Sequence, residues 1–151
     1  MFRHYLTTRA GEIDVLPRRR LLAASLVPAS VIATARRLGE RLREQVDEAL
    51  RDVDVLVGPT TPSAAPPIPT APRLRSKEEA WMTAVAGRSV FTNPFNITGH
   101  PALSVPCGFT GDDLPVGLQI VGRYYAEADL LRIGAAYESV TEWHHRRPSF
   151  A

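Results

Sequence analysis

The strand predicted over residues 116–121 places the strongest constraint on the fold, because it has apolar side chains on both faces. Successive side chains of a strand point to opposite sides of a sheet, so Val116, Leu118 and Ile120 share one face while Val121 lies on the other. Such strands are typical of parallel or mixed sheets covered on both sides. Two more strands are predicted at 53–57 and 102–105. Three strands of this kind need neighbours, so we expect the sheet to be incomplete within this chain.

A long amphipathic helix is predicted to end at about residue 51. Its apolar residues recur every three or four positions, as on one face of an α-helix: Val31, Ala35, Leu38, Leu42, Val46 and Ala49. Charged pairs four residues apart indicate that the other face is solvated: Arg36–Glu40, Arg43–Asp47 and Asp47–Arg51. Pro28 interrupts the pattern, so a separate helix or turn is predicted over 18–27.

Three further helices are predicted later in the chain. The longest covers about residues 126–143, with a buried stripe of Leu130, Ile133, Tyr137 and Val140. A shorter helix is predicted within 91–101 and ends at Gly99. A capping-box pattern from Ser76 to Glu79 opens another. Helices that alternate with strands predict an α/β fold.

Residues 58–72 contain six prolines. Proline has no backbone N–H, so this segment is predicted to form neither a helix nor a central strand. Two interpretations are open from the residues alone. The segment is either a linker between domains, which its composition favours, or an ordered loop over the rim of an active site.

The composition excludes several classes of function. The formal net charge is only +2 and the charges are mixed along the chain, so no nucleic-acid partner is expected. No run approaches the roughly 18 apolar residues of a membrane helix, and the first residues lack the apolar core of a secretory signal. Cys107 is the single cysteine, so no internal disulfide can form, and we expect a soluble cytoplasmic protein.

The candidate catalytic residues do not form a recognisable set. Ser104 lies inside a predicted strand without the Gly-x-Ser-x-Gly turn that exposes a nucleophile, so it is interpreted as a buried structural serine. Cys107 and His100 are seven residues apart, and a Cys–His hydrolase is a weaker alternative. Lys77 is the only lysine and is interpreted as a surface residue, since a catalytic lysine is normally buried.

No metal ion or cofactor is expected. His144 and His145 would point about 100° apart on a helix, and no spacing of Cys, His and Asp matches a zinc site. The run Arg18, Arg19 and Arg20 offers a possible anion site. A charge run is, however, more typical of a solvated helix end.

Three blocks of the sequence resemble the amidase-signature family. They are VDVLVGPTTP at 53–62, NPFNITGHPALSVPCG at 93–108 and LPVGLQIVGR at 114–123. The order and spacing of the resemblance hold from about residue 18 to residue 148. The whole chain, 1–151, is therefore interpreted as one partial amidase domain. The blocks are specific together, although none is specific alone.

The resemblance implies a hydrolase of carboxylic amides, in a family that includes the A subunits of the glutamyl-tRNA amidotransferases. It implies an α/β/α fold with a mixed sheet, of which this chain is the C-terminal portion. Catalysis in the family uses a serine nucleophile, a second serine at a cis peptide bond and a lysine, all upstream of these blocks. This sequence has no Gly-Gly-Ser-Ser-Gly run. No catalytic residue is carried over, and the chain is expected to be inactive alone.

The resemblance also implies a role for the residues just before the second block. In the family, the C-terminal part gives one wall of the substrate pocket, which makes Ser89, Phe91 and Asn93 candidate substrate-binding residues by position. The proline-rich segment then becomes an ordered crossover. The amidotransferase subunits tend to have an acidic residue near the position of Ser89, so its absence here favours a general amidase.

Two functional hypotheses follow. The first is a segment of an amidase that binds a small-molecule amide only when an N-terminal half completes it. The second is a non-catalytic interaction module, or the complementing half of a split amidase or amidotransferase. Such a module would associate with a partner or with itself through exposed sheet edges.

Overall fold

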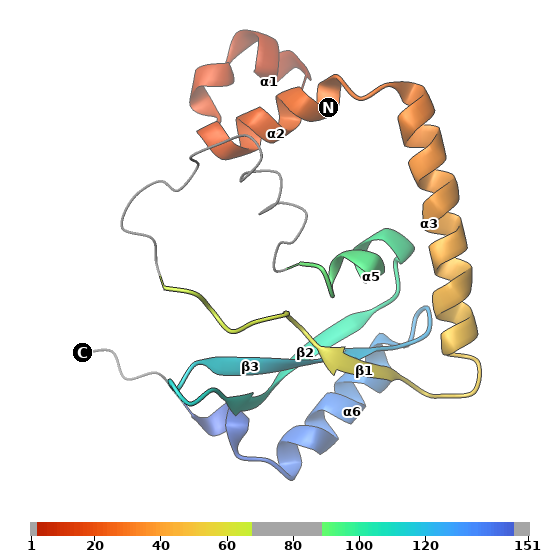
Figure 1. Ribbon diagram of the computed structural model, residues 1–151, viewed down its shortest axis with the longest axis vertical. Coiled ribbons are helices and arrows are strands. Elements are labelled where there is room, and N and C mark those ends of the chain that lie inside the picture. Colours follow the sequence, from red (N-terminus) through yellow and green to blue (C-terminus); the bar gives the residue numbers. More distant parts are fainter. Residues whose placement is uncertain (1–2, 68–88, 147–151) are drawn as a thin grey trace. The chain divides into compact units, whose positions relative to one another are not determined.

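The computed structural model describes residues 3–67 and 89–146, and the chain divides into two compact units, Met1–Glu40 and Arg41–Ala151 (Figure 1). The first unit contains α1 (Arg3–Thr8), the 3-10 helix η1 (Ala10–Glu12), α2 (Val15–Ser25) and the start of α3 (Ala29–Ala49). The break between α2 and α3 falls at Pro28, as predicted, because proline has no N–H for the helical ladder. The helix expected from residue 18 begins earlier, at Val15.

The run of arginines lies inside α2 and not at its end. Arg18 Nη1 donates a hydrogen bond of 2.9 Å to the carbonyl oxygen of Ala10, so it ties α2 to η1. Arg19 and Arg20 are exposed. The interpretation as a solvated charge run therefore holds for these two residues, whereas Arg18 has a structural role.

The second unit is built on a three-stranded sheet in the order β1-β3-β2. β1 (Leu56–Pro59) and β2 (Ala102–Phe109) both pair antiparallel with the central strand β3 (Pro115–Val121). The predicted α/β class is confirmed, with antiparallel pairing throughout the part of the chain that the structure describes. The first strand was predicted too early, at 53–57. The carbonyl oxygen of Val53 instead accepts a hydrogen bond of 2.9 Å from Arg123, before the strand begins.

The hairpin of β2 and β3 is longer than predicted. β2 continues past residue 105 to Phe109, although Pro106 has no N–H to donate. Proline is tolerated here because β2 lies at an edge of the sheet. The register shifts between Pro106 and Gly108, so Cys107 lies at an irregularity in the pairing.

Helix α6 (Glu127–Ser139) packs against one face of this sheet. Its Leu130 contacts Val105 of β2 and Ile120 of β3, and all three side chains are almost completely buried. Ile133 and Tyr137 of α6 pack against the same cluster. Three of the four residues predicted for the buried stripe therefore face the core.

The prediction that the fourth stripe residue, Val140, is buried was wrong. It follows the last residue of α6 and is 80% exposed. The helix ends at Ser139, before the predicted end at about residue 143, so the apolar periodicity of the sequence continues past the helix. Near the middle of α6 the helix lies very close to β2, since a Cβ at Gly134 would lie 2.6 Å from Leu103 Cδ2.

Polar contacts hold the C-terminal part of α3 against the loop between α5 (Asn93–Thr98) and β2. Arg43 Nε donates to the carbonyl oxygen of Thr98 at 3.1 Å, and Asp47 Oδ1 lies 3.1 Å from His100 Nε2. The other ring nitrogen of His100, Nδ1, lies 2.9 Å from Thr98 Oγ1, and both residues are buried. Arg43 and Asp47 are exposed, as predicted for this face, and each also makes a tertiary contact that the sequence did not indicate.

The loop after β3 completes this polar junction. Arg123 Nη2 donates to the carbonyl oxygens of Leu50 at 3.0 Å and Val53 at 2.9 Å. The hydroxyl of Tyr124 donates to the carbonyl oxygen of Thr98. The last carbonyls of a helix have no partners within it. Arg123 therefore satisfies the carbonyl of Leu50, the first residue after α3, and that of Val53 in the segment that leads to β1.

The apolar stripe of α3 is buried only near its C-terminal end. Val46 and the following Leu50 are buried, whereas Val31 and Leu38 are 53% and 58% exposed. The predicted apolar face is therefore present, but most of it is not covered within the described residues.

No single helix within residues 3–67 and 89–146 is long and apolar enough to cross a membrane. The bent pair Pro17–Ser25 and Ala29–Ala49 meets the requirement by length and composition alone when the two are taken together.

Replacing His100 with alanine is expected to lower the free energy of unfolding by about 2–4 kcal/mol. The change removes both ring hydrogen bonds and the contact with Tyr124, whose ring centroid lies 4.3 Å away. The exposed His145 gives the control, for which His145→Ala should change stability by less than about 0.5 kcal/mol. Urea unfolding followed by circular dichroism measures both. Equal effects would contradict a structural role for the junction.

Candidate functional site

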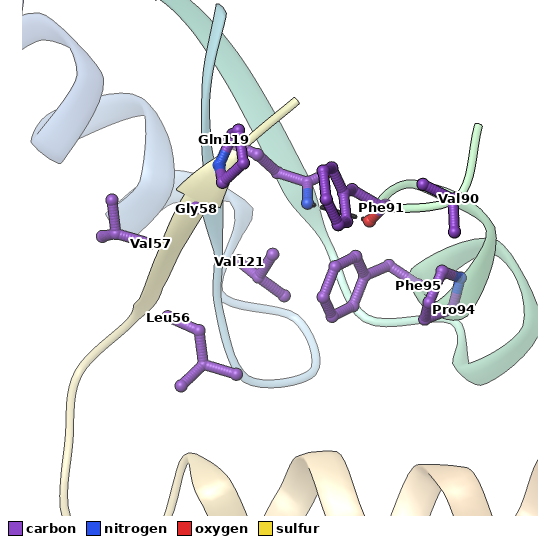
Figure 2. Close-up of a pocket in the computed structure, with 10 residues that line it drawn as sticks. Leu56, Val57, Gly58, Val90, Phe91, Pro94, Phe95, Gln119 and Val121 are labelled. Atoms are coloured by element: carbon purple, nitrogen blue, oxygen red, sulfur yellow. Dashed lines mark hydrogen bonds between the residues drawn. The ribbon is translucent and has the colours of Figure 1, made fainter. Parts of the chain in front are cut away.

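An apolar hollow of about 240 Å³ lies between β1, β3 and the segment around α5 (Figure 2). On β3 it uses Gln119 and Val121, which alternate with the core residues Leu118 and Ile120 and so belong to the face opposite α6. The lining comes from three segments: Leu56, Val57, Gly58 and Pro59 of β1, Gln119 and Val121 of β3, and Val90, Phe91, Pro94 and Phe95.

A turn at residues 89–92 and the short helix α5 form one wall of this hollow. The carbonyl oxygen of Ser89 accepts hydrogen bonds from the N–H groups of Thr92 at 3.1 Å and Asn93 at 2.7 Å. Pro94 lies in the first turn of α5, where a missing N–H costs nothing. Gly99 ends the helix as predicted, with a φ of 82° that glycine adopts readily.

The wall is tied to the sheet through Gln119. Its Nε2 donates a hydrogen bond of 3.0 Å to the carbonyl oxygen of Phe91. Figure 2 shows the rings of Phe91 and Phe95 facing β1 and β3, with Gln119 and Val121 between them and β1. The turn and α5 are thus held where both rings border the hollow.

Of the three candidate substrate-binding residues, the structure places Phe91 in the lining. Ser89 and Asn93 are exposed residues of the turn that opens α5, and they are not part of the lining. Sequence reasoning missed Phe95 and Gln119. A signal for Gln119 was present, since it is the one polar side chain in the otherwise apolar strand at 116–121. That any of these residues binds substrate stays a prediction.

Ser104 is not the buried serine that its place in a strand predicted. It is exposed on β2, and its Oγ lies 2.7 Å from the hydroxyl of Thr60. The two hydroxyls meet above Gly117, where a Cβ would come within 2.9 Å of Ser104 Oγ and 2.8 Å of Thr60 Oγ1. The structural role is retained, because the hydroxyl joins β2 to the residue that follows β1.

The alternative of a Cys–His pair is contradicted. His100 precedes the first residue of β2, whereas Cys107 lies near the other end of that strand. His100 is engaged with Asp47 and Thr98, and Cys107 Sγ contacts the carbonyl oxygen of Val116 at 3.5 Å. The extended strand between the two residues keeps them apart.

His144 and His145 stack on each other in the 3-10 helix η2 (Trp143–His145), with ring centroids 3.8 Å apart. Within residues 3–67 and 89–146, no group of three or more Cys, His, Asp or Glu residues is arranged to hold a metal ion. Lys77 and the predicted capping box at 76–79 lie outside the described residues.

The sequence profile described as Amidase matches residues 7–131. This match covers most of the chain, and the fold agrees with that of solved amidases. The chain therefore belongs to the amidase family, also called the amidase-signature family.

Comparison with individual proteins points to the same family. The chain is 44% identical over 110 residues to the A subunit of glutamyl-tRNA(Gln) amidotransferase from Chloroflexus aggregans, covering 73% of this chain and 21% of the relative. It is 34% identical over 151 residues to the corresponding protein of Microcystis aeruginosa, covering 97% of this chain and 30% of the relative. The chain thus spans between a fifth and a third of the length of these relatives.

A solved structure described as a crystal structure of amidase superposes with a TM-score of 0.71 at 29% identity. The superposition covers 91% of this chain and 31% of the amidase chain. The fold of the chain is therefore similar to one part of a larger amidase fold.

Replacing Gly117 with alanine is expected to lower the free energy of unfolding by about 1–3 kcal/mol, because the new methyl group would displace Thr60 or Ser104. Gly58 gives a matched control in the same sheet, since a Cβ there meets nothing within 4 Å. Gly58→Ala should leave stability within about 0.5 kcal/mol of the parent chain. Urea denaturation measures both variants. A harmless Gly117→Ala change would mean that the contact between the hydroxyls and β3 is loose.

Proposed function

We propose that this chain is the C-terminal portion of a carboxylic-amide hydrolase domain, to which it contributes part of the sheet and one wall of the substrate pocket. The serine nucleophile and the lysine base come from another segment, so the chain does not hydrolyse amides alone. A small-molecule amide binds productively only when both segments are together. The site of action is the cytoplasm. The single Cys107 allows no internal disulfide, which fits this reducing compartment.

The observation that carries this proposal is that neither of the two nucleophiles considered from the sequence, Ser104 and Cys107, has a base as its partner within the described residues. The hydroxyl of Ser104 is paired with Thr60, and the sulfur of Cys107 contacts the carbonyl oxygen of Val116. A nucleophile needs a base within hydrogen-bond reach. The family match over residues 7–131 supports amide hydrolysis as the chemistry of the completed domain.

Exposed apolar surface supports the need for a second segment. Val31 and Leu38 of α3 are more than half exposed, and Val57 of the edge strand β1 is 61% exposed. Surfaces of this kind suit burial against the remaining part of an amidase domain. The edges of β1 and β2 also favour a second candidate function, a non-catalytic interaction module or the complementing half of a split enzyme.

The purified chain is expected to show no turnover of primary carboxamides and no labelling by a serine-directed fluorophosphonate, because it lacks an activated serine. Co-expression with the part of the Chloroflexus aggregans relative outside the matched region provides the missing segment. Amide hydrolysis and labelling of that added segment should then appear together. Release of ammonia and the labelled band on a gel measure the two effects.

Ser104→Ala and Cys107→Ala are the control variants for the chain alone. Clear hydrolysis by the chain alone would contradict the proposal, and its loss in one of these variants would show which residue is the nucleophile. A stable complex with the added segment that stays inactive, even though that segment is active in its own enzyme, would favour the interaction module.

A further inference from the structure

The apolar hollow has no charged side chain in its lining, which limits what it can bind. The lining consists of Leu, Val, Phe, Pro and Gly residues, with Gln119 as the one polar side chain among them. A charged group that is buried without a partner is strongly disfavoured. Within the part of the chain that the structure describes, the hollow therefore suits a neutral group. It does not suit the ammonium and carboxylate groups of a free amino acid.

The side chain of Gln119 is held in one orientation. The carbonyl oxygen of Phe91 can only accept a hydrogen bond, so the Gln119 atom 3.0 Å from it must be the donor Nε2. Within the described residues, the Gln119 side chain makes this hydrogen bond through Nε2 and no other. The carbonyl oxygen Oε1 is left as an acceptor, and Gln119 is only 6% exposed on the central strand.

The shape of the hollow favours a flat apolar group. Figure 2 shows the rings of Phe91 and Phe95 along one wall, facing Leu56 and Val121. Aromatic rings bind other rings in offset or edge-on contacts. The volume of about 240 Å³ lies below the range of about 300–1,000 Å³ of sites for drug-sized ligands. A single ring or a short branched alkyl group matches this space.

We infer that the hollow binds the neutral, apolar group of a carboxamide, with Gln119 Oε1 accepting a hydrogen bond from the amide N–H. This inference rests on the proposed function and gives it a substrate class, namely uncharged aromatic or short branched amides. Glutamine carries two charges that the described lining does not pair, so this lining favours a neutral amide over glutamine. Gln119 acts here as a specificity-determining residue, because its Oε1 favours amides that carry an N–H. It takes no part in bond cleavage.

A titration of the ¹⁵N-labelled full chain, followed by amide chemical shifts, tests this inference with known probes. Benzamide should shift the signals of Gln119, Val121 and Phe95, whereas glutamine at the same concentration should shift none of them. N,N-dimethylbenzamide keeps the ring but has no N–H, so it should bind about fivefold more weakly. N-methylbenzamide retains one N–H and should bind like benzamide, which separates the loss of the donor from the added bulk.

A matched pair of variants checks the location of the site. Phe95→Ala should weaken benzamide binding by about tenfold, because it removes one wall of the hollow. Phe109→Ala, at the end of β2 and outside the lining, should leave the affinity unchanged. Equal shifts with glutamine, equal affinity for N,N-dimethylbenzamide, or benzamide shifts confined to residues outside the hollow would each overturn the inference.

This titration needs no turnover, so it separates the two proposals. Selective binding of benzamide without restored hydrolysis by the completed domain would contradict the proposed function and leave the pocket assignment in place. Restored hydrolysis that prefers glutamine over benzamide would support the amidase function and overturn the assignment of the substrate class.

Discussion

The central strand β3 is the element on which both the core and the apolar hollow depend. Its backbone pairs with β1 on one side and with β2 on the other. Ile120 points into the core under α6, while Gln119 and Val121 line the hollow on the other face. Because successive side chains alternate, a register shift of one residue would exchange the two sets. The packing of α6 on the sheet therefore also holds the polar and apolar groups of the hollow in their places.

Unpaired backbone carbonyls explain why polar side chains gather where α3 meets the rest of its unit. Arg123 donates to the carbonyl oxygen of Leu50, directly after α3, and to that of Val53 in the segment before β1. The carbonyl oxygen of Thr98 likewise accepts hydrogen bonds from Arg43 and from the hydroxyl of Tyr124. A guanidinium group has five N–H donors in one plane, which suits several carbonyls at once. The side chains of this junction thus bind backbone carbonyls at the end of α5 and just after α3.

Signals that act within a few residues predicted the elements well, and signals that depend on distant partners did not. Pro28 and Gly99 mark the helix ends that they predicted, because each limits the backbone at its own position. Asp47 is exposed as predicted, but the pattern of α3 could not reveal its contact with His100, because this partner on the α5–β2 loop is distant in sequence. In the hollow, the resemblance to the amidases pointed to Phe91. The strand pattern gave the face of Gln119, but it could not reveal which segment would lie across from it.

The apolar stripe of α3 links the packing of this chain to its proposed dependence on another segment. Leu38 and Val46 lie on one helical face and have the same chemistry, yet Leu38 is 58% exposed and Val46 is 8% exposed. The amino-acid pattern does not change between them, so the difference comes from what packs against each. An amphipathic helix gains most of its stability by burying its apolar face. Under the proposed function, the segment that brings the nucleophile also covers this stripe, so assembly of the catalytic groups and completion of the core are the same event.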